Sequence, residues 1–581
     1  MSIPTVHIAI VGLGPKGFYG FERLLANLGQ SEKIPPVHLH LFNETAHFAT
    51  GWVYDTGQPD YLLMNYPNRH ISIKPESDPK PLISLPSFVQ WRSKRTGRTP
   101  EAEADRIAPR KEVGQYLNQY FEELMALSIP NLSIRKHRTR VTGIKRNDTG
   151  FQIQTSDACV DQLCFESVLV TTGHSTAINS KLQTETPHPG YIPFVYPFSK
   201  TLGRIPPGAV VACKGMGLTA IDTILGLTEG KGGQFVETDV NGLSYIKSGD
   251  EPACILPYSR SGIPIIPRGR QSSSYTQSSF YLHNFVEQLP EGCRELDFET
   301  EVLPYIIQDL ETSYYYALFN FYGFDFKPVQ NRLQLQQVQD AFHKLHPEAE
   351  AFDLNNLWFP KLEPVTDRQK AIATYWDFWL AALEQQNSAY VAAASAWRFL
   401  AEDFNKLYSG GLFSAQSEKR IQDHYFSLFN RTAYGPPVIN IKKMRALMQA
   451  GILDFSYARA AELTTDPQLQ LNHKGESIPI DYSLDARIPR GYFKKASLLF
   501  NADPKLFSCS GPSTGNLRCT REGYPLNEAG RAENRLVLYG TPTEARLFDN
   551  DTLSRIHNDT ASQWAMQTAD RLIQKNVLIT T

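Results

Sequence analysis

The sequence predicts an α/β protein with two dinucleotide-binding (Rossmann-like) domains, the second inserted in the first, and an additional helical insertion. Two strand–turn–helix patterns predict the domains: the apolar runs 6–11 and 209–213 each lead into a G-x-G-x-x-G/A turn and then a helix. A third observation predicts the insertion, because residues 276–430 are rich in aromatic residues and long helical patterns.

Each residue of such a turn has a physical role. The first glycine permits the turn, the second lets the backbone approach a pyrophosphate, and the third small residue lets the helix pack on the strand. The helix N-terminus then faces the phosphates. Two such turns predict two dinucleotides, and the usual pair is FAD and NAD(P)H. The candidate contacts are Gly12, Gly14, Pro15, Lys16 and Gly17 in the first turn, and Gly215, Gly217, Leu218 and Thr219 in the second.

The surroundings of the first turn favour FAD. The second apolar strand ends at Asn43 and Glu44, where an acidic residue normally binds the adenosine ribose. Asn43 can still bond a hydroxyl, although it could also simply end a strand. The strand ending in Thr172-Gly173-His174 is typical of flavoproteins, as is a closing strand before Gly540, where Thr541 replaces the usual acid.

The segment after the second strand is expected near the flavin ring. We expect Trp52 and Val141 to contact FAD, and Met64 and Asn65 to lie next to the flavin as the candidate catalytic residues. An ordinary loop packed on the domain edge explains the same pattern.

The second turn carries a cofactor preference. The strand 254–258 ends in Ser259 and Arg260, with Arg268 shortly after, where an NAD site would carry an acid. A guanidinium there can clamp a 2′-phosphate, which favours NADPH over NADH. A solvated arginine cluster is the alternative.

These assignments predict the domain boundaries. We expect an FAD-binding domain over residues 1–200 and 488–581, and an NADPH-binding domain over 201–275 and 431–487. The helical insertion, residues 276–430, is a candidate substrate cap.

Composition narrows the function classes. The 581 residues carry a formal net charge of −2 with no long basic stripe, so we expect no nucleic-acid partner. No apolar run reaches the roughly 18 residues of a membrane span, and the first strand begins too early for a secretory signal, so we expect a cytoplasmic protein without membrane association. A homo-oligomer is compatible with the sequence.

The cysteines indicate neither redox nor metal chemistry. Cys159 and Cys164 have the C-x₄-C spacing of disulfide reductases, but they fall in a region that reads as a β-hairpin rather than on a helix after the first turn. No C-x-x-C or H-x-x-x-H spacing is present, so we predict no metal site.

With these motifs in place, the chain resembles the FAD/NAD(P)-binding flavoproteins related to N-hydroxylating monooxygenases, in particular the aspartate N-hydroxylase-type branch. The resemblance is carried by both glycine turns and Asp222, and by the segments 62–65, 172–174, 248–252 and 259–262.

The resemblance implies an FAD- and NADPH-dependent monooxygenase that N-hydroxylates the amine of an amino acid or related small molecule. NADPH would reduce FAD, and a C4a-hydroperoxyflavin formed with O₂ would oxidise the amine. The alternative is an NADPH-dependent flavin reductase, dehydrogenase or oxidase without oxygen insertion. An amino-acid substrate needs a carboxylate clamp, for which Arg487 and Arg490 are candidates, although surface arginines are the more ordinary explanation.

Overall fold

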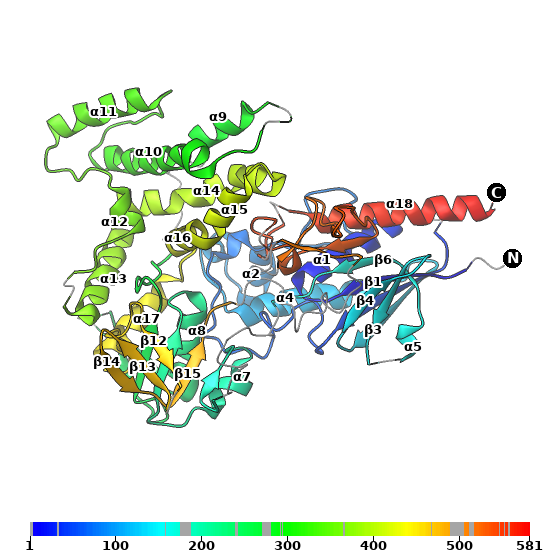
Figure 1. The fold of residues 1–581 in the computed structure, drawn as a ribbon, viewed down its shortest axis with the longest axis horizontal. Helices are drawn as coiled ribbons and strands as arrows, with labels where there is room; N and C mark the ends of the chain where they lie inside the picture. The colour runs from blue at the N-terminus through cyan, green and yellow to red at the C-terminus, as the bar shows by residue number, and fades with distance from the viewer. Residues whose placement is uncertain are drawn as a thin grey trace. The chain divides into compact units, whose positions relative to one another are not determined.

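The structure is a computed structural model that divides the chain into two compact units. Unit 1 comprises residues 1–179 and 489–581, and unit 2 comprises residues 180–488. The structure describes residues 4–580 apart from 32–33, 157, 175–187, 239–241, 270–279, 291, 293, 364–365, 466–467, 489–504, 511–515, 545, 551 and 556–557. The fold is mixed α/β with parallel sheets, as predicted (Figure 1).

Unit 1 is built on one sheet of seven strands. Its order is β3-β2-β1-β6-β5-β4, and β18 also pairs with β6. The strands β1, β2, β3, β6 and β18 pair in parallel, whereas β4 and β5 form an antiparallel extension. The bounds are β1 Val6–Val11, β2 Val37–Asn43, β3 Leu132–Arg138, β4 Gly143–Arg146, β5 Phe151–Gln154, β6 Phe165–Val170 and β18 Leu536–Leu538.

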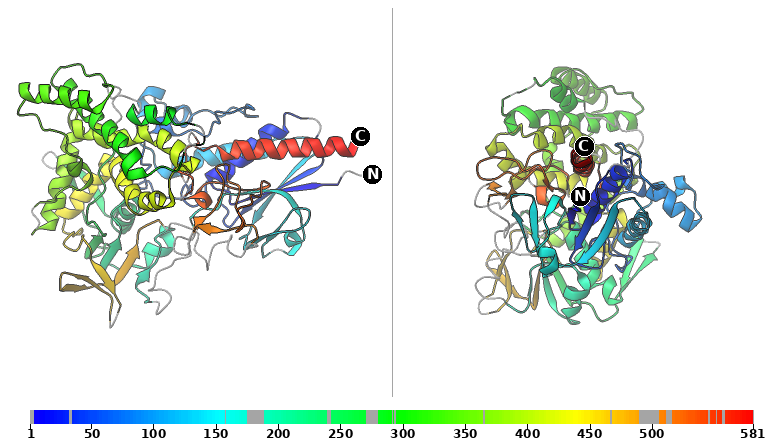
Figure 2. Two further views of the ribbon diagram at one scale, coloured as in Figure 1. Left: turned by 45° about the horizontal axis from the view of Figure 1, so that its top comes forward. Right: turned by 90° about the vertical axis from the view of Figure 1, so that its right-hand side faces the viewer.

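Helices pack on one face of this sheet. The apolar side chains of β1 and β2 alternate, so that Ile8 and Leu39 contact the helices, whereas Ala9 and Phe42 join a second cluster on the other face. Helices α1 and α18 lie side by side in both views (Figure 1, Figure 2). The helices of this unit are α1 Pro15–Leu28, α2 Phe88–Thr96, α3 Pro100–Ala104, α4 Arg110–Met125, α5 Ala158–Asp161 and α18 Thr560–Thr580.

Unit 2 contains a smaller parallel sheet. Its order is β11-β8-β15-β7, and each neighbouring pair is parallel. Helix α8 (Leu218–Leu227) follows β8 through the second glycine turn. The strands are β7 Tyr191–Ile192, β8 Val210–Lys214, β11 Cys254–Tyr258 and β15 Tyr482–Asp485, and small antiparallel sheets add β9 Gln234–Thr238, β10 Gly242–Ile246, β12 Glu462–Thr464, β13 Gln470–His473 and β14 Glu476–Pro479.

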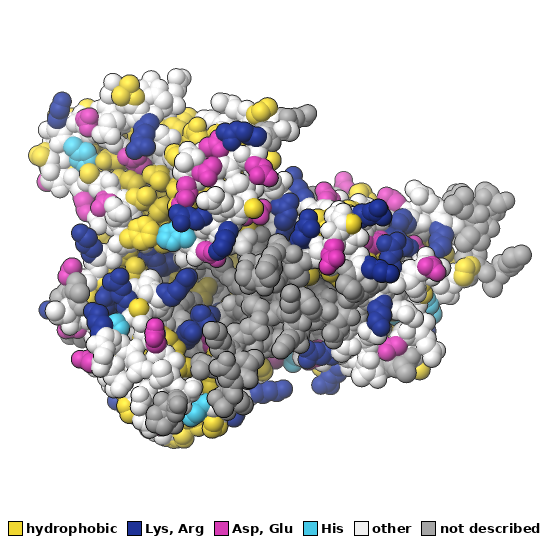
Figure 3. Space-filling view, viewed as in Figure 1, with side chains coloured by type: hydrophobic (Ala, Val, Ile, Leu, Met, Phe, Trp, Pro, Cys, Tyr) yellow, Lys and Arg dark blue, Asp and Glu magenta, His cyan; other side chains and the backbone are white. Residues whose placement is uncertain are grey.

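A helical segment separates β11 from β15 in the chain. Its core is aromatic, and Trp379, Trp397 and Tyr408 are fully buried. On the face shown in Figure 3, lysine, arginine and acidic side chains are interspersed over it. The helices are α9 Tyr281–Glu287, α10 Leu303–Phe321, α11 Arg332–Leu345, α12 Leu354–Trp358, α13 Arg368–Glu384, α14 Ala389–Gly410, α15 Ala415–Arg420, α16 Phe426–Ala433 and α17 Val438–Gln449.

The apolar pattern of residues 478–486 predicts one strand returning from unit 2, and this prediction is wrong. The structure divides the stretch between β14 and β15, which belong to different sheets. Asp481 causes the break, because its backbone N–H donates to Val210 O at 2.9 Å and its carboxylate accepts from Val210 N at 2.8 Å. The chain therefore turns at Asp481 to enter the parallel sheet.

The region around Cys159 and Cys164 and the lengths of the helices also bear on the predictions from the sequence. The hairpin expected around Cys159 and Cys164 is present as the antiparallel β5–β6 pair, with the short helix α5 in its connection. Within the described ranges, no helix is both long enough and apolar enough to cross a bilayer.

Candidate functional site

The first glycine turn lies tightly against the end of β6. Gly12 has φ +90°, and a Cβ on it would lie 2.9 Å from the backbone of Thr171 and Thr172. At Gly17 a Cβ would lie 2.2 Å from Gly12 O, so the helix can approach the turn only without a side chain there. The turn and the Thr172-Gly173 segment are therefore neighbours, as expected of parts of one site.

Gly14 differs from the other two glycines. A Cβ on it would meet nothing within 4 Å. Gly14 is the N-cap of α1, and no side chain caps the N–H groups of that helix. Open space in front of uncapped N–H groups is what a dinucleotide pyrophosphate requires, so the residues present fit this ligand.

Asn43 organises the loops around this turn. Its Oδ1 accepts a hydrogen bond from Leu13 N at 3.1 Å, while its Nδ2 donates to Thr45 O at 3.0 Å and His47 O at 3.3 Å. A carboxylate could accept the first bond but could not donate the other two. The missing acid therefore has a structural reason: this position holds the glycine turn with an amide. Glu44, by contrast, is exposed, and its Oε1 lies 3.9 Å from Arg140.

Two other predicted segments reach the same turn. A Cβ on Gly51 would lie 3.5 Å from the Cα of Gly14, which places the Gly51-Trp52 segment beside the second glycine. Gly540 has φ +76°, and a Cβ on it would lie 3.1 Å from Lys16. The Lys16 Nζ donates to Ser554 O at 2.7 Å and lies 4.8 Å from the Tyr539 ring centroid. Lys16 therefore ties α1 to the C-terminal segment, and its contact with a phosphate stays a prediction.

The remaining predicted FAD residues are buried or half-buried. Met64 is buried in the hydrophobic cluster under α1, and its N–H donates to Ala108 O at 2.9 Å. Val141 is buried in the cluster on the other face of the sheet. Asn65 is half-buried next to Met64, and His174 follows β6. Their proximity to the flavin stays a prediction.

The second glycine turn repeats the geometry of the first. Gly215 has φ +132°, and a Cβ on it would lie 3.0 Å from Ala486 O. Gly217 is the N-cap of α8 with no side-chain cap, and a Cβ there would meet nothing within 4 Å. Leu218 and Thr219 form the first turn of α8. This site also fits a dinucleotide pyrophosphate.

The predicted 2′-phosphate contacts lie at the end of β11. Ser259 Oγ is 3.4 Å from Met216 Sδ in the glycine turn and accepts a hydrogen bond from Gly262 N at 3.1 Å. The adjacent Arg260 is exposed. Ser259 is therefore fixed beside the second glycine turn, and Arg260 follows it directly.

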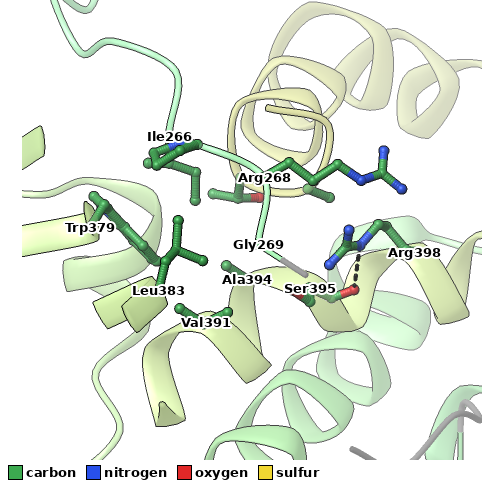
Figure 4. Close-up of a pocket in the computed structure, with 12 residues that line it drawn as sticks. Ile266, Arg268, Gly269, Trp379, Leu383, Val391, Ala394, Ser395 and Arg398 are labelled. Carbon is green, nitrogen blue, oxygen red and sulfur yellow. Dashed lines mark hydrogen bonds between the residues drawn. The ribbon is translucent and has the colours of Figure 1, made fainter. Parts of the chain in front are cut away.

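Arg268 is part of a different cluster, which the sequence did not indicate. Together with Arg398 from α14 it lines a small pocket, as Figure 4 shows. Burial, followed by the charge of Arg268, lowers the pKa of Arg398 to about 9. Apart from the Ser395 carbonyl at 3.4 Å, Arg398 has no hydrogen-bond or carboxylate partner in the described ranges. Two guanidinium groups side by side favour an anion between them.

The two arginines proposed as a carboxylate clamp have different outcomes. Arg487 is bound by Asp485, with Nε–Oδ1 and Nη2–Oδ2 distances of 2.8 and 2.6 Å, so its guanidinium is already paired. Arg490 lies outside the described residues. The structure also brings together three histidines of β1 and β2, His7, His38 and His40. The sequence does not indicate this cluster, because H-x-H spacing places two histidines on one side only if they lie on a strand.

Comparison with known proteins agrees with this geometry. Residues 9–175 match a family model described as FAD-NAD(P)-binding. The chain is 26% identical to the nitrosuccinic acid synthase of Aspergillus oryzae, over 93% of this chain and 88% of the relative. It is 25% identical to an L-aspartate N-monooxygenase (nitrosuccinate-forming) of Streptomyces cremeus, over 94% and 91%. Among solved structures, ornithine hydroxylase from Pseudomonas aeruginosa aligns with a TM-score of 0.48 and 11% identity, over 98% of this chain and 100% of that chain.

Proposed function

Because residues 9–175 match an FAD-NAD(P)-binding family model and the chain is similar to L-aspartate N-monooxygenases, we propose that it is a flavoprotein that uses FAD, NADPH and O₂ to N-hydroxylate the amine of a small amino acid. The observation that carries this proposal is the similarity to L-aspartate N-monooxygenases along more than nine-tenths of the chain. L-Aspartate is accordingly the first substrate to test.

We assign one cofactor to each unit. Unit 1 is the FAD-binding domain, supported by the family match and by the space in front of Gly14. Unit 2 is the NADPH-binding domain, inserted between the two halves of unit 1 and supported by the same space in front of Gly217. The inserted two-domain arrangement and the role of the helical segment as a substrate cap both belong to this proposal.

FAD, when bound, would supply the redox chemistry, with two electrons drawn from NADPH and with O₂ as the oxidant, one oxygen atom going to the amine nitrogen and the other to water. The chain's own residues bind and orient. The N–H groups of α1 and α8 hold the two pyrophosphates, and Asn43 keeps the first turn in its binding conformation. Arg260 pairs with the 2′-phosphate of NADPH.

The pair Arg268 and Arg398 supplies substrate recognition in this proposal. Arginine keeps its charge in proteins, so the lowered pKa of Arg398 reflects an environment that an anion would relieve. The pocket is small and suits a single anionic group rather than a whole nucleotide. A substrate carboxylate fits this description. The competing occupant is a phosphate of NADPH, which the sequence suggested for Arg268.

The variant Arg398→Gln separates the two occupants. If the pair binds a carboxylate, the KM for the amino acid rises about 10-fold or more while the KM for NADPH stays within twofold, since a hydrogen bond to a charged group contributes about 1.5–3 kcal/mol. A rise in the KM for NADPH alone would reassign the pocket to the cofactor. Arg420→Gln is the matched control, because Arg420 is exposed and its guanidinium pairs with Glu299 in the described part of unit 2.

The function itself is tested with the purified protein. We expect a yellow protein containing FAD that oxidises NADPH and consumes O₂ faster when L-aspartate is added, with an N-oxygenated product. NADPH oxidation without any oxygenated product, across L-aspartate and other small amino acids, would favour the reductase or oxidase alternative. A protein that binds no FAD and never oxidises NADPH would contradict both.

A further inference from the structure

Three histidines form a cluster on the sheet of unit 1, on the face opposite α1. His7 and His38 are direct partners across the β1–β2 pair, and His40 follows two residues later on the same side of β2. The ring centroids of His7 and His38 are 5.3 Å apart, and those of His7 and His40 are 5.2 Å apart. Side-chain alternation on two paired strands therefore brings three imidazoles together.

The ring nitrogens converge. One nitrogen of each of the three rings lies within 4.8 Å of the other two. His7 Nδ1 and His40 Nε2 are 3.0 Å apart. Three imidazoles on one tetrahedral zinc ion, with Zn–N of about 2.0–2.1 Å, have their nitrogens roughly 3.3 Å apart. The His7–His40 separation is therefore already close to the value expected around one zinc ion.

Two further observations distinguish this cluster from ordinary packing. His38 Nδ1 is buried and has no hydrogen-bond partner in the part of the chain that the structure describes. A buried nitrogen without a partner is costly and is a group that a ligand would satisfy. The other nitrogen of His40, Nδ1, lies 2.9 Å from His137 Nε2 on β3. Metal-bound histidines are usually held in this way through their second nitrogen.

Two of the three rings are partly exposed, so an ion can reach the cluster. His40 is fully buried, whereas His7 and His38 are half-buried and leave a route from solvent.

The chemistry of the surroundings selects the ion. Arg135 on β3 is the register partner of His40, and its charge opposes a cation. The cluster contains no carboxylate. Ions that bind mainly oxygen, such as Mg²⁺ and Ca²⁺, therefore find no suitable ligands, whereas Zn²⁺, Cu²⁺ and Ni²⁺ bind imidazole well.

We propose that His7, His38 and His40 form a binding site for one divalent transition-metal ion, with zinc as the reference ligand and water completing its coordination. His137 is a positioning residue that orients His40. The site lies near the starts of β1 and β2, whereas the glycine turn and Asn43 follow the ends of these strands. Metal binding therefore ties the two strands together away from the proposed FAD site, and stabilises the folded state by binding it selectively.

The test titrates ZnCl₂ into the FAD-loaded protein after removal of metals by chelator, and follows binding by calorimetry. We expect one equivalent bound, a raised thermal midpoint, and no binding of MgCl₂. The variants His38→Gln and His40→Gln should weaken zinc binding at least about 10-fold and abolish the thermal shift. His424→Gln, which changes an exposed histidine in unit 2, should leave both unchanged.

Retained FAD absorbance shows that each variant is folded. If His40→Gln does not fold, His7→Gln supplies the same comparison, because His7 is only half-buried. As a second measurement, the electron paramagnetic resonance spectrum of added Cu²⁺ should show nitrogen coupling that these variants lose. Absence of one-site binding, or zinc affinity unchanged in His38→Gln and His40→Gln, would overturn the proposal. Because neither measurement uses turnover, the result is independent of the proposed function.

Discussion

Replacing Asn43 by aspartate separates two explanations for the missing acid at the end of β2. If this position binds the adenosine ribose, as in other dinucleotide sites, aspartate should preserve or improve FAD binding. If Asn43 instead holds the glycine turn through its amide, aspartate should weaken FAD binding. The structure favours the second explanation, because both ends of the Asn43 amide are occupied by the surrounding loops.

The expected magnitude follows from the bonds lost. Aspartate keeps the acceptor for Leu13 N but loses the donors to Thr45 O and His47 O. Two hydrogen bonds of about 1 kcal/mol each stabilise the ordered form of the loops by about 2 kcal/mol. If FAD binds only to this ordered form, the loss of both bonds raises the dissociation constant for FAD by up to about 30-fold. Flavin fluorescence quenching, measured on protein stripped of FAD, gives this constant directly.

A matched control is available at Asn147. Its Oδ1 accepts from Gly150 N at 2.7 Å and from Thr149 N at 3.1 Å, and the described part of the chain offers its amide nitrogen no acceptor. Asn147→Asp should therefore leave FAD affinity and thermal stability unchanged. An Asn43→Asp protein that binds FAD as tightly as the wild type, or more tightly, would refute the explanation.

Four other substitutions test the roles of individual side chains and glycines. Gly14→Ala should fold normally but bind FAD at least about 10-fold more weakly, because its Cβ enters only the open space in front of α1. Gly17→Ala should not fold, because its Cβ would lie 2.2 Å from a backbone oxygen. Normal FAD affinity in Gly14→Ala, measured by fluorescence, would contradict the first expectation. Arg260→Ala should raise the KM for NADPH by about 10- to 100-fold and leave that for NADH unchanged, and equal effects in steady-state kinetics would rule out the 2′-phosphate contact. Burial would raise the pKa of Glu251, but hydrogen bonds from Tyr245 and two backbone N–H groups lower it to about 2. Glu251→Gln should therefore lower the free energy of unfolding by up to about 3 kcal/mol at pH 7. This difference shrinks as pH falls from 4.5 toward 2, because the wild-type carboxylate becomes protonated. Urea unfolding of unit 2 measures this cost, the exposed Asp250→Asn is its control, and a pH-independent difference would exclude the carboxylate as the cause.

The sequence was most informative where glycine was required by sterics. The residues Gly12, Gly17 and Gly215 all have close backbone neighbours, and the motif that predicts them depends on just this packing. The mixed α/β fold with parallel sheets follows from the apolar runs before these turns. The resemblance to N-hydroxylating monooxygenases is confirmed by relatives that match more than nine-tenths of the chain.

Other features depended on contacts between distant segments. The break at Asp481 needs Val210 as its partner, 271 residues away in the chain. Arg268 and Arg398 line one pocket although 130 residues separate them in the chain, so neither position alone indicates an anion site. The histidine cluster needs the register of β1 against β2. Periodicity and spacing cannot supply such pairings, because they report only on local structure.

Turnover under ¹⁸O₂ tests whether the protein transfers oxygen to an amino-acid nitrogen. The purified protein is supplied with FAD, NADPH and L-aspartate, and the product is analysed by mass spectrometry. We expect a product that carries ¹⁸O on nitrogen from the labelled gas, with NADPH consumed in proportion to product. NADPH consumption that yields only hydrogen peroxide, with L-aspartate and other small amino acids recovered unlabelled, would contradict it.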